Sequence, residues 1–149
     1  MPRDYDLAWR WYACPAIILT LILLLTVLCL ADTAAAAVSD DEAVACILGE
    51  ARGEYAKHGY TAFLALADAL RNRGTLKGVY GCSAPIPLKE QAFLKRMGYD
   101  REALRAWKES ASIDLVAGAS HWESTDFKTP YWAKGMKVVY QVGKHRFYK

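Results

Sequence analysis

The polar and apolar positions divide the chain into an apolar N-terminal run and a longer region of amphipathic segments. No charged side chain occurs in residues 11–31, and the stretch Ile17–Leu30 is almost wholly aliphatic. After this run, charged residues recur among the apolar ones to the end of the chain. The pattern predicts an N-terminal hydrophobic export or anchor helix within residues 1–37 and one domain over residues 38–149.

Three interpretations are open for the apolar run. Arg3 and Arg10 before it and Ala35-Ala36-Ala37 after it are typical of a cleaved export signal. The run is also just long enough to span a bilayer, so residues 13–31 would then be a retained membrane anchor; a buried core helix is a third interpretation. With either of the first two, the domain is exported to the periplasm, the cell wall or the outer face of the inner membrane.

The first amphipathic segment begins with a helix-capping sequence. Ser39-Asp40-Asp41-Glu42 has the Ser-x-x-Glu form of a capping box. The next apolar residues recur at helical spacing, and they are Val44, Ile47, Leu48 and Ala51. We therefore expect a helix over residues 40–54, followed by a connection over residues 55–59.

Three more helices are predicted before Gly118. Apolar spacing favours a helix over residues 60–71, and turn-forming residues indicate a loop over residues 74–87. A short helix is expected over residues 88–97 and a longer one over residues 100–118.

The pattern changes after Gly118. Residues 137–142 and 145–148 are rich in β-branched and aromatic side chains, with a Gly143-Lys144 turn between them. Residues 119–123 could supply a further short strand. The expected fold class is α+β, mainly helical, with a small antiparallel sheet near the C-terminus.

Charge becomes more basic once the N-terminal run is set aside. Lys plus Arg falls from 19 to 17 and Asp plus Glu from 16 to 13, so the net charge of +3 becomes +4. From residue 128 onward there are basic residues and no acidic ones: Lys128, Lys134, Lys137, Lys144, Arg146 and Lys149. A basic end favours anionic polymers such as cell-wall glycans, or lipid headgroups, although a solvated surface with uneven charge fits equally well. Export argues against nucleic acid as a partner, and a monomer is expected.

Two cysteines belong to the predicted domain, Cys46 and Cys82. In an oxidising compartment they could form a disulfide, which would stabilise the fold by roughly 3–4 kcal/mol. A buried free Cys46 is equally compatible with the sequence.

Glu50 is the strongest candidate for acid–base chemistry. It lies on the margin of the apolar stripe, where partial desolvation disfavours the charged form of a carboxyl group, as a general acid requires. A surface glutamate paired with Arg52 or Lys57 is the alternative. Gly49 and Gly53 flank Glu50, and each costs about 1 kcal/mol relative to alanine in a helix. We therefore expect a packed helix or a bound ligand to approach the backbone of this segment closely.

Glu54 lies one turn after Glu50, which suggests a two-carboxylate glycosidase. Residues at this spacing have Cβ atoms about 5–6 Å apart, near the separation in retaining enzymes. Carboxylates on one helix face point the same way, however, whereas a retaining pair must flank a sugar. We expect Glu54 to be a structural or substrate-positioning residue.

The sequence supports neither a metal site nor a serine hydrolase. His58, His121 and His145 are far apart, and no His-Glu-x-x-His, Cys-x-x-Cys or Gly-x-Ser-x-Gly spacing occurs. No metal and no cofactor are predicted. Aromatic residues in the C-terminal part fit core packing or contact with sugar rings, and they are Trp122, Tyr131, Trp132 and Tyr148.

Three motifs in order resemble the SleB/CwlJ-type cell-wall hydrolases, the family that includes spore-cortex-lytic enzymes. Residues 49–54 (Gly-Glu-Ala-Arg-Gly-Glu), followed by Gly59 and Asn72-Arg73, resemble the opening motif of that family. Residues 118–122 (Gly-Ala-Ser-His-Trp) with Trp132, and residues 143–148 (Gly-Lys-His-Arg-Phe-Tyr), are similar to its later motifs. The resemblance covers about residues 43–148.

The resemblance implies a lysozyme-like helical fold with a small sheet, acting on the glycan strands of peptidoglycan. It assigns the catalytic acid to Glu50, and a single acid/base group suffices in a lytic transglycosylase because the sugar's own hydroxyl attacks. The expected cleft or supporting residues are Arg52, Glu54, Asn72, His121, Trp132, His145 and Tyr148. Hydrolysis by a muramidase-type reaction is the other chemistry, and a membrane-tethered cell-wall-binding module without catalysis is the alternative function.

Overall fold

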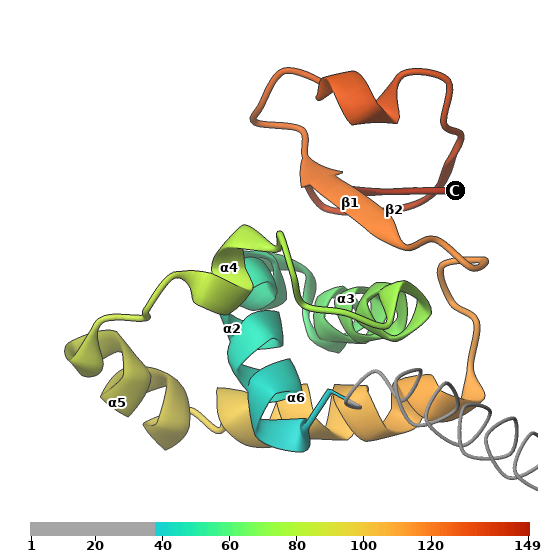
Figure 1. Ribbon diagram of the computed structural model, residues 1–149. Helices are drawn as coiled ribbons and strands as arrows, with labels where there is room; N and C mark the ends of the chain where they lie inside the picture. Colours follow the sequence, from blue (N-terminus) through green and yellow to red (C-terminus); the bar gives the residue numbers. More distant parts are fainter. Residues whose placement is uncertain (1–37) are drawn as a thin grey trace, which may run out of the picture. The chain divides into compact units, whose positions relative to one another are not determined.

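The structure, a computed structural model, describes residues 38–149 (Figure 1). In this part of the protein, helix α2 (Asp40–His58) packs against α3 (Tyr60–Arg73), α4 (Tyr80–Ser83) and α6 (Tyr99–Glu109). The predicted capping box is present. The hydroxyl of Ser39 accepts the N–H of Glu42 at 3.3 Å, and the Glu42 carboxylate accepts the N–H of Ser39 at 3.0 Å. These bonds satisfy backbone donors that the first turn of a helix leaves free.

The predicted connection over residues 55–59 is wrong, because α2 continues to His58 and only Gly59 separates it from α3 (Tyr60–Arg73). The aromatic ring of Tyr55 stacks on Phe63, with ring centroids 4.2 Å apart. This contact buries one more turn of α2 against α3, which the apolar spacing up to Ala51 did not indicate.

Helix α3 lies almost wholly in the core, where it contacts α2 and α6 (Tyr99–Glu109). Helix α6 ends well before the predicted Gly118, and a short 3₁₀ turn (Ser110–Ser112) follows it. The buried Asp68 carboxylate of α3 accepts the N–H of Val116 at 2.9 Å. Burial raises the pKa of Asp68. Because the N–H of Val116 donates to this side chain, it is not paired with a backbone carbonyl of a helix, in agreement with the early end of α6.

Helix α4 (Tyr80–Ser83) lies within the predicted loop over residues 74–87. A disulfide joins Cys82 of α4 to Cys46 of α2, which settles the question that the sequence left open. Helix α5 (Leu88–Arg96) follows and confirms the predicted short helix.

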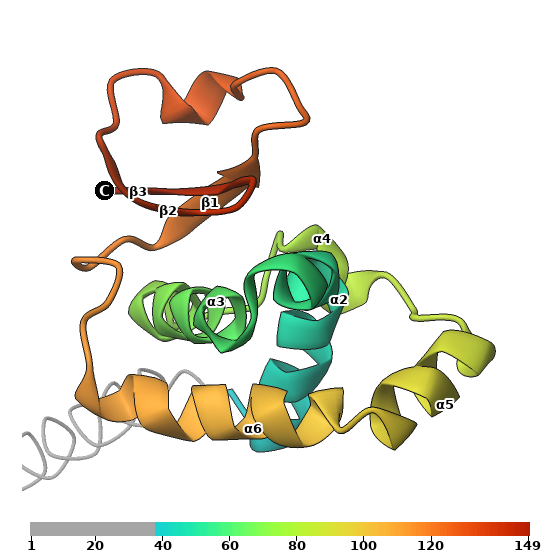
Figure 2. The ribbon, with the colours of Figure 1, turned by 180° about the vertical axis from the view of Figure 1, so that it is seen from behind.

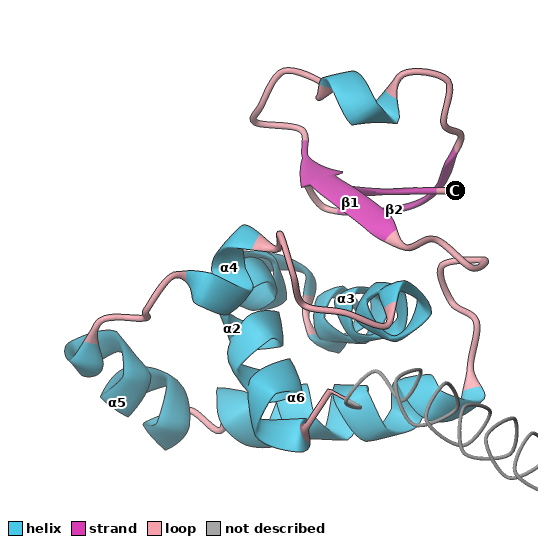
Figure 3. Cartoon of the chain, in the orientation of Figure 1, coloured by secondary structure: helices cyan, strands magenta, loops and turns pink. Residues whose placement is uncertain are grey.

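Three strands form the C-terminal sheet, β1 (His121–Ser124), β2 (Val138–Val142) and β3 (His145–Tyr148) (Figures 2 and 3). The order is β1-β3-β2, and both pairings are antiparallel. Phe147 of β3 is fully buried and joins the hydrophobic core that the helices form. The α+β prediction, mainly helical with a small antiparallel sheet, is confirmed.

None of the helices within residues 38–149 is long and apolar enough to cross a membrane. The predicted export or anchor helix, including residues 13–31, lies outside the residues that the structure describes.

Candidate active site

The carboxylate of Glu50 is held by two N–H donors from distant parts of the chain. The backbone N–H of Gly81 in α4 donates to Oε1 of Glu50. The indole Nε1–H of Trp122 in β1 donates to Oε2 at 3.1 Å. Both carboxylate oxygens are thereby fixed in position, and Glu50 remains partly exposed.

Two clefts meet at Glu50. The small cleft has a volume of about 440 Å³ and the large cleft a volume of about 780 Å³. Four residues line both clefts: Glu50, Tyr80, Trp122 and Trp132. A long polymer could therefore extend to both sides of the Glu50 carboxyl group, which is the geometry needed to cleave within a chain.

Close backbone contact allows α4 to reach Glu50. A β-carbon on Gly49 would overlap the carbonyl oxygen of Gly81, and one on Gly81 would lie 2.6 Å from Oε1 of Glu50. The disulfide between Cys46 and Cys82 joins the same two helices one residue from Gly81. The glycine pair and the disulfide together place the Gly81 N–H beside the acid.

Glu54 is buried, with 8% of its surface exposed, and its carboxylate contacts a backbone N–H and a histidine ring of the domain. Its Oε2 accepts the backbone N–H of Lys144 at 3.0 Å and lies 3.4 Å from Nε2 of His58. Gly143 has a φ of +53°, and a β-carbon there would overlap Oε2 of Glu54. Glu54 thus joins α2 to the turn between β2 and β3.

Glu123 is a second buried carboxylate in the lining of the large cleft. Its Oε1 lies 2.6 Å from Nη2 of Arg146 and accepts the hydroxyl proton of Tyr148. Its Oε2 is buried and, within the described domain, has no hydrogen-bond partner. Burial and the Glu123 carboxylate raise the pKa of Tyr148, so its hydroxyl keeps the proton that it donates.

His145 is the buried histidine of the large cleft. Burial lowers its pKa, although the charges of Glu54 and Glu50 act in the opposite direction. The ring is therefore neutral at neutral pH. Its buried Nδ1 has no hydrogen-bond partner within residues 38–149.

No protein-family model matches the sequence, and no curated protein sequence matches it. Two solved structures are similar to it. The catalytic domain of the Bacillus cereus SleB protein is 22% identical with a TM-score of 0.50, covering 74% of this chain and 89% of that one. The catalytic domain of the germination-specific lytic transglycosylase SleB from Bacillus anthracis is 21% identical with a TM-score of 0.50, covering 74% of this chain and 93% of that one. The domain has the SleB catalytic-domain fold.

This SleB-type fold brings most of the predicted site residues together. Besides Glu50, four of the predicted site residues line the two clefts: Glu54, His121, Trp132 and His145. Arg52 is held in an ion pair with Glu90 at 2.6 Å. Asn72 donates to the carbonyl of Ala119 at 3.2 Å, and Tyr148 contacts Glu123, so both hold the segments around β1 in place.

Several cleft residues were not predicted as site residues, among them Tyr80, Gly81, Glu123 and Phe127. Trp122 was named only as an aromatic residue that could contact a sugar ring, not as a donor to Glu50. Glu123 lies directly opposite Arg146 in the register of β1 and β3. Opposite charges on paired strands are a recognised signal, and it could have been used had the strand pairing been known. Tyr80 follows a loop that shows no periodic pattern, so nothing local pointed to it.

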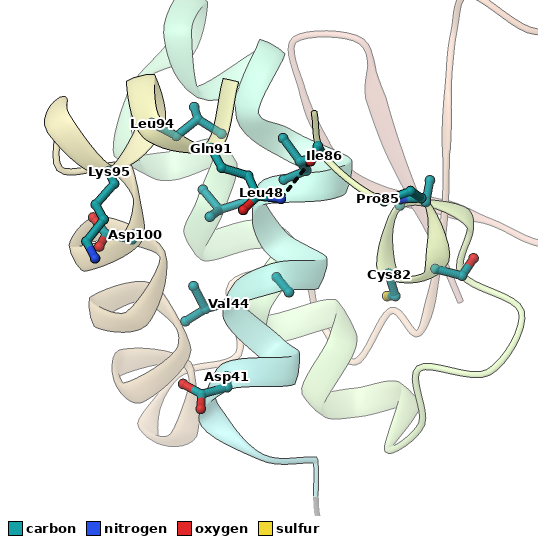
Figure 4. Close-up of a pocket in the computed structure, with 14 residues that line it drawn as sticks. Asp41, Val44, Leu48, Cys82, Pro85, Ile86, Gln91, Leu94, Lys95 and Asp100 are labelled. Carbon is teal, nitrogen blue, oxygen red and sulfur yellow. Dashed lines mark hydrogen bonds between the residues drawn. The ribbon is translucent and has the colours of Figure 1, made fainter. Parts of the chain in front are cut away.

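A further hollow of about 460 Å³ lies beside a different stripe of α2 (Figure 4). Val44 and Leu48 line it from α2, and the side-chain amide of Gln91 donates to the carbonyl of Ile86 at 2.7 Å. None of the predicted site residues lines this hollow. Within residues 38–149, no three His, Cys, Asp or Glu side chains are grouped so as to hold a metal ion.

Proposed function

We propose that residues 38–149 are the catalytic domain of an exported enzyme that cleaves the glycan strands of peptidoglycan, with Glu50 as its acid/base group. One observation carries this proposal: the Glu50 carboxyl group lies where two clefts meet, fixed by the N–H groups of Gly81 and Trp122. The SleB fold supports it, because one of the similar structures is the catalytic domain of a lytic transglycosylase.

In this reaction Glu50 first gives its proton to the glycosidic oxygen while the bond from that oxygen to the sugar carbon breaks. The resulting carboxylate then removes a proton from the group that attacks the carbon. If that group is a hydroxyl of the same sugar, the product has an anhydro end. If it is water, the product has a reducing end. One carboxyl group serves both steps, and Glu50 regains its proton.

The other two carboxylates in the large cleft are less suited to this role. Oε2 of Glu54 already accepts the N–H of Lys144, and Oε1 of Glu123 is paired with Arg146. Both of these carboxylates are buried and line the large cleft alone, whereas Glu50 is partly exposed at the point where the two clefts meet.

The surrounding side chains suit a sugar polymer. Trp132 and His121 have ring centroids 5.4 Å apart and line the small cleft. Lys128 adds a cation to the large cleft, where an anionic wall polymer would lie. We assign Arg52, Asn72 and Tyr148 supporting roles, because each contacts another residue of the domain.

The decisive experiment is digestion of purified peptidoglycan by the domain and by Glu50→Gln. We expect the variant to lose activity by about a hundredfold or more, on the scale of general acid catalysis, with an unchanged melting temperature. Glu54→Gln and Glu123→Gln are matched comparisons that each remove another cleft carboxylate. Mass spectrometry of the fragments then distinguishes anhydro from reducing ends. Wall binding by wild type without release of fragments would instead favour the tethered binding module.

A further inference from the structure

A side groove of about 350 Å³ branches from the large cleft between α2 and α5. Gly49, Glu50 and Gly53 line both the groove and the large cleft. The other residues of the groove are Arg52, Ala56, Glu90, Phe93, Leu94 and Tyr99. The groove therefore begins beside the proposed acid and runs away from it along α2.

Gly53 is a glycine that the fold itself does not require. A β-carbon added there would meet nothing within 4 Å, whereas one on Gly49 would overlap the carbonyl oxygen of Gly81. Gly53 lies in the middle of α2, and its φ is not in the left-handed region. Alanine is the better helix former, so neither packing nor backbone conformation explains glycine here.

The position of Gly53 points to a ligand instead. It lies on the boundary between the large cleft and the side groove, where any side chain would narrow the passage from one to the other. Beyond it, Phe93 is 46% exposed and supplies an apolar wall, and the Arg52–Glu90 ion pair supplies polar groups. A groove of this size and mixed chemistry suits a short peptide.

We propose that the peptide branch of a peptidoglycan strand passes over the backbone of Gly53 as it leaves the large cleft and enters the side groove. This inference rests on the proposed function, because peptidoglycan consists of a glycan chain in which alternate sugars bear a short peptide. The branch has to leave the large cleft near the acid. Gly53 lies at the boundary between that cleft and the side groove, and it has no side chain that would obstruct the branch.

The test compares wild type and Gly53→Leu on two substrates, peptidoglycan with its peptides and the same glycan after an amidase has removed them. We expect Gly53→Leu to lose about tenfold or more in kcat/KM on the peptide-bearing substrate, the scale of a steric clash in a packed site. On the bare glycan, which has no branch to enter the side groove, the loss should be at least threefold smaller. Ala45→Leu, at an exposed position of α2 outside both clefts and the side groove, is the matched control and should behave as wild type on both substrates.

Gly53→Ala provides a second variant that should fold well. We expect its melting temperature to rise by a few degrees, because alanine favours the helix, while kcat/KM on the peptide-bearing substrate falls. Equal losses on both substrates, or no loss on either, would overturn the assignment of the side groove. Failure of wild type to cleave the bare glycan and the intact wall would refute the proposed function and this inference with it.

Discussion

The backbone of Gly49 in α2 lies directly against the carbonyl group of Gly81 in α4, with no space for a β-carbon between them. This contact allows the Gly81 N–H to reach the carboxylate of Glu50, the residue that follows Gly49. The cost of a glycine inside α2 is therefore linked to the position of the proposed acid.

Gly49→Ala should destabilise the domain by about 1–3 kcal/mol, the usual effect of inserting a methyl group into a packed site. Gly53→Ala is the matched control in the same helix, since a β-carbon there meets nothing within 4 Å. We expect that control to stabilise the domain by up to about 1 kcal/mol. Chemical denaturation of the two variants checks both values, and equal effects would contradict the close contact between Gly49 and Gly81.

Reduction of the Cys46–Cys82 disulfide should lower the free energy of unfolding by about 4 kcal/mol, because the bond closes a loop with a sequence separation of 36. Denaturation with and without reductant measures this loss. The Cys46→Ala/Cys82→Ala double variant should be insensitive to reductant and is the control. Activity should also fall in the reduced domain, because α4 supplies the Gly81 N–H to Glu50. Identical unfolding midpoints with and without reductant would show that the bond contributes no stability.

Trp122→Phe should lower kcat by about 10- to 100-fold with a smaller effect on KM. The variant keeps an aromatic ring but loses the N–H that donates to Oε2 of Glu50 at 3.1 Å. A hydrogen bond to a charged group contributes about 1.5–3 kcal/mol, which corresponds to that range of rates. Steady-state kinetics on soluble glycan fragments tests the expectation. Trp132→Phe is the matched control, since Trp132 also lines both clefts but the donor to Glu50 is Trp122; a similar loss of kcat in both variants would argue against a specific role for that donor.

Burial of His145 predicts a pH dependence of stability. Its pKa in the folded domain lies below its ordinary value of 6.5, so below pH 6.5 the unfolded chain binds a proton that the folded domain does not. Stability should therefore be fully present above pH 6.5 and decrease as the pH falls below that value, with a slope of up to about 1.4 kcal/mol per pH unit.

The measurement is the free energy of unfolding of wild type and His145→Gln across this range of pH. Other groups titrate in both proteins, so the difference between the two curves isolates His145. Parallel curves would mean that the histidine has the same pKa in the folded and unfolded chains.

Local sequence patterns determined most of the helices and strands. The capping box at Ser39, the apolar spacing that follows it and the β-branched residues of β2 and β3 all act between residues a few positions apart. The same local reasoning selected Glu50, because its place on the margin of an apolar stripe follows from helical periodicity. For this reason the α+β class could be predicted from the sequence, and Glu50 could be proposed as the acid once the family resemblance supported that role.

The surroundings of Glu50 were decided only by the tertiary structure. Its two donors, Gly81 and Trp122, are 31 and 72 positions away along the chain. No local pattern indicates that such residues meet, because their contact depends on how helices and strands pack. Helix α4 is a single turn, with no repeated spacing from which it could be predicted, and its place is set by the disulfide and the Gly49–Gly81 contact.

The two glycines of α2 also show which features the sequence indicates and which depend on tertiary packing. From the sequence, Gly49 and Gly53 are equivalent, since both cost helix stability and both imply a close approach. Tertiary packing distinguishes them, because α4 fills the space beside Gly49 and leaves the space beside Gly53 open. The sequence by itself thus indicated a close approach to the backbone of this helix. Only the folded chain decided that Gly49 contacts α4 and that the space beside Gly53 is open.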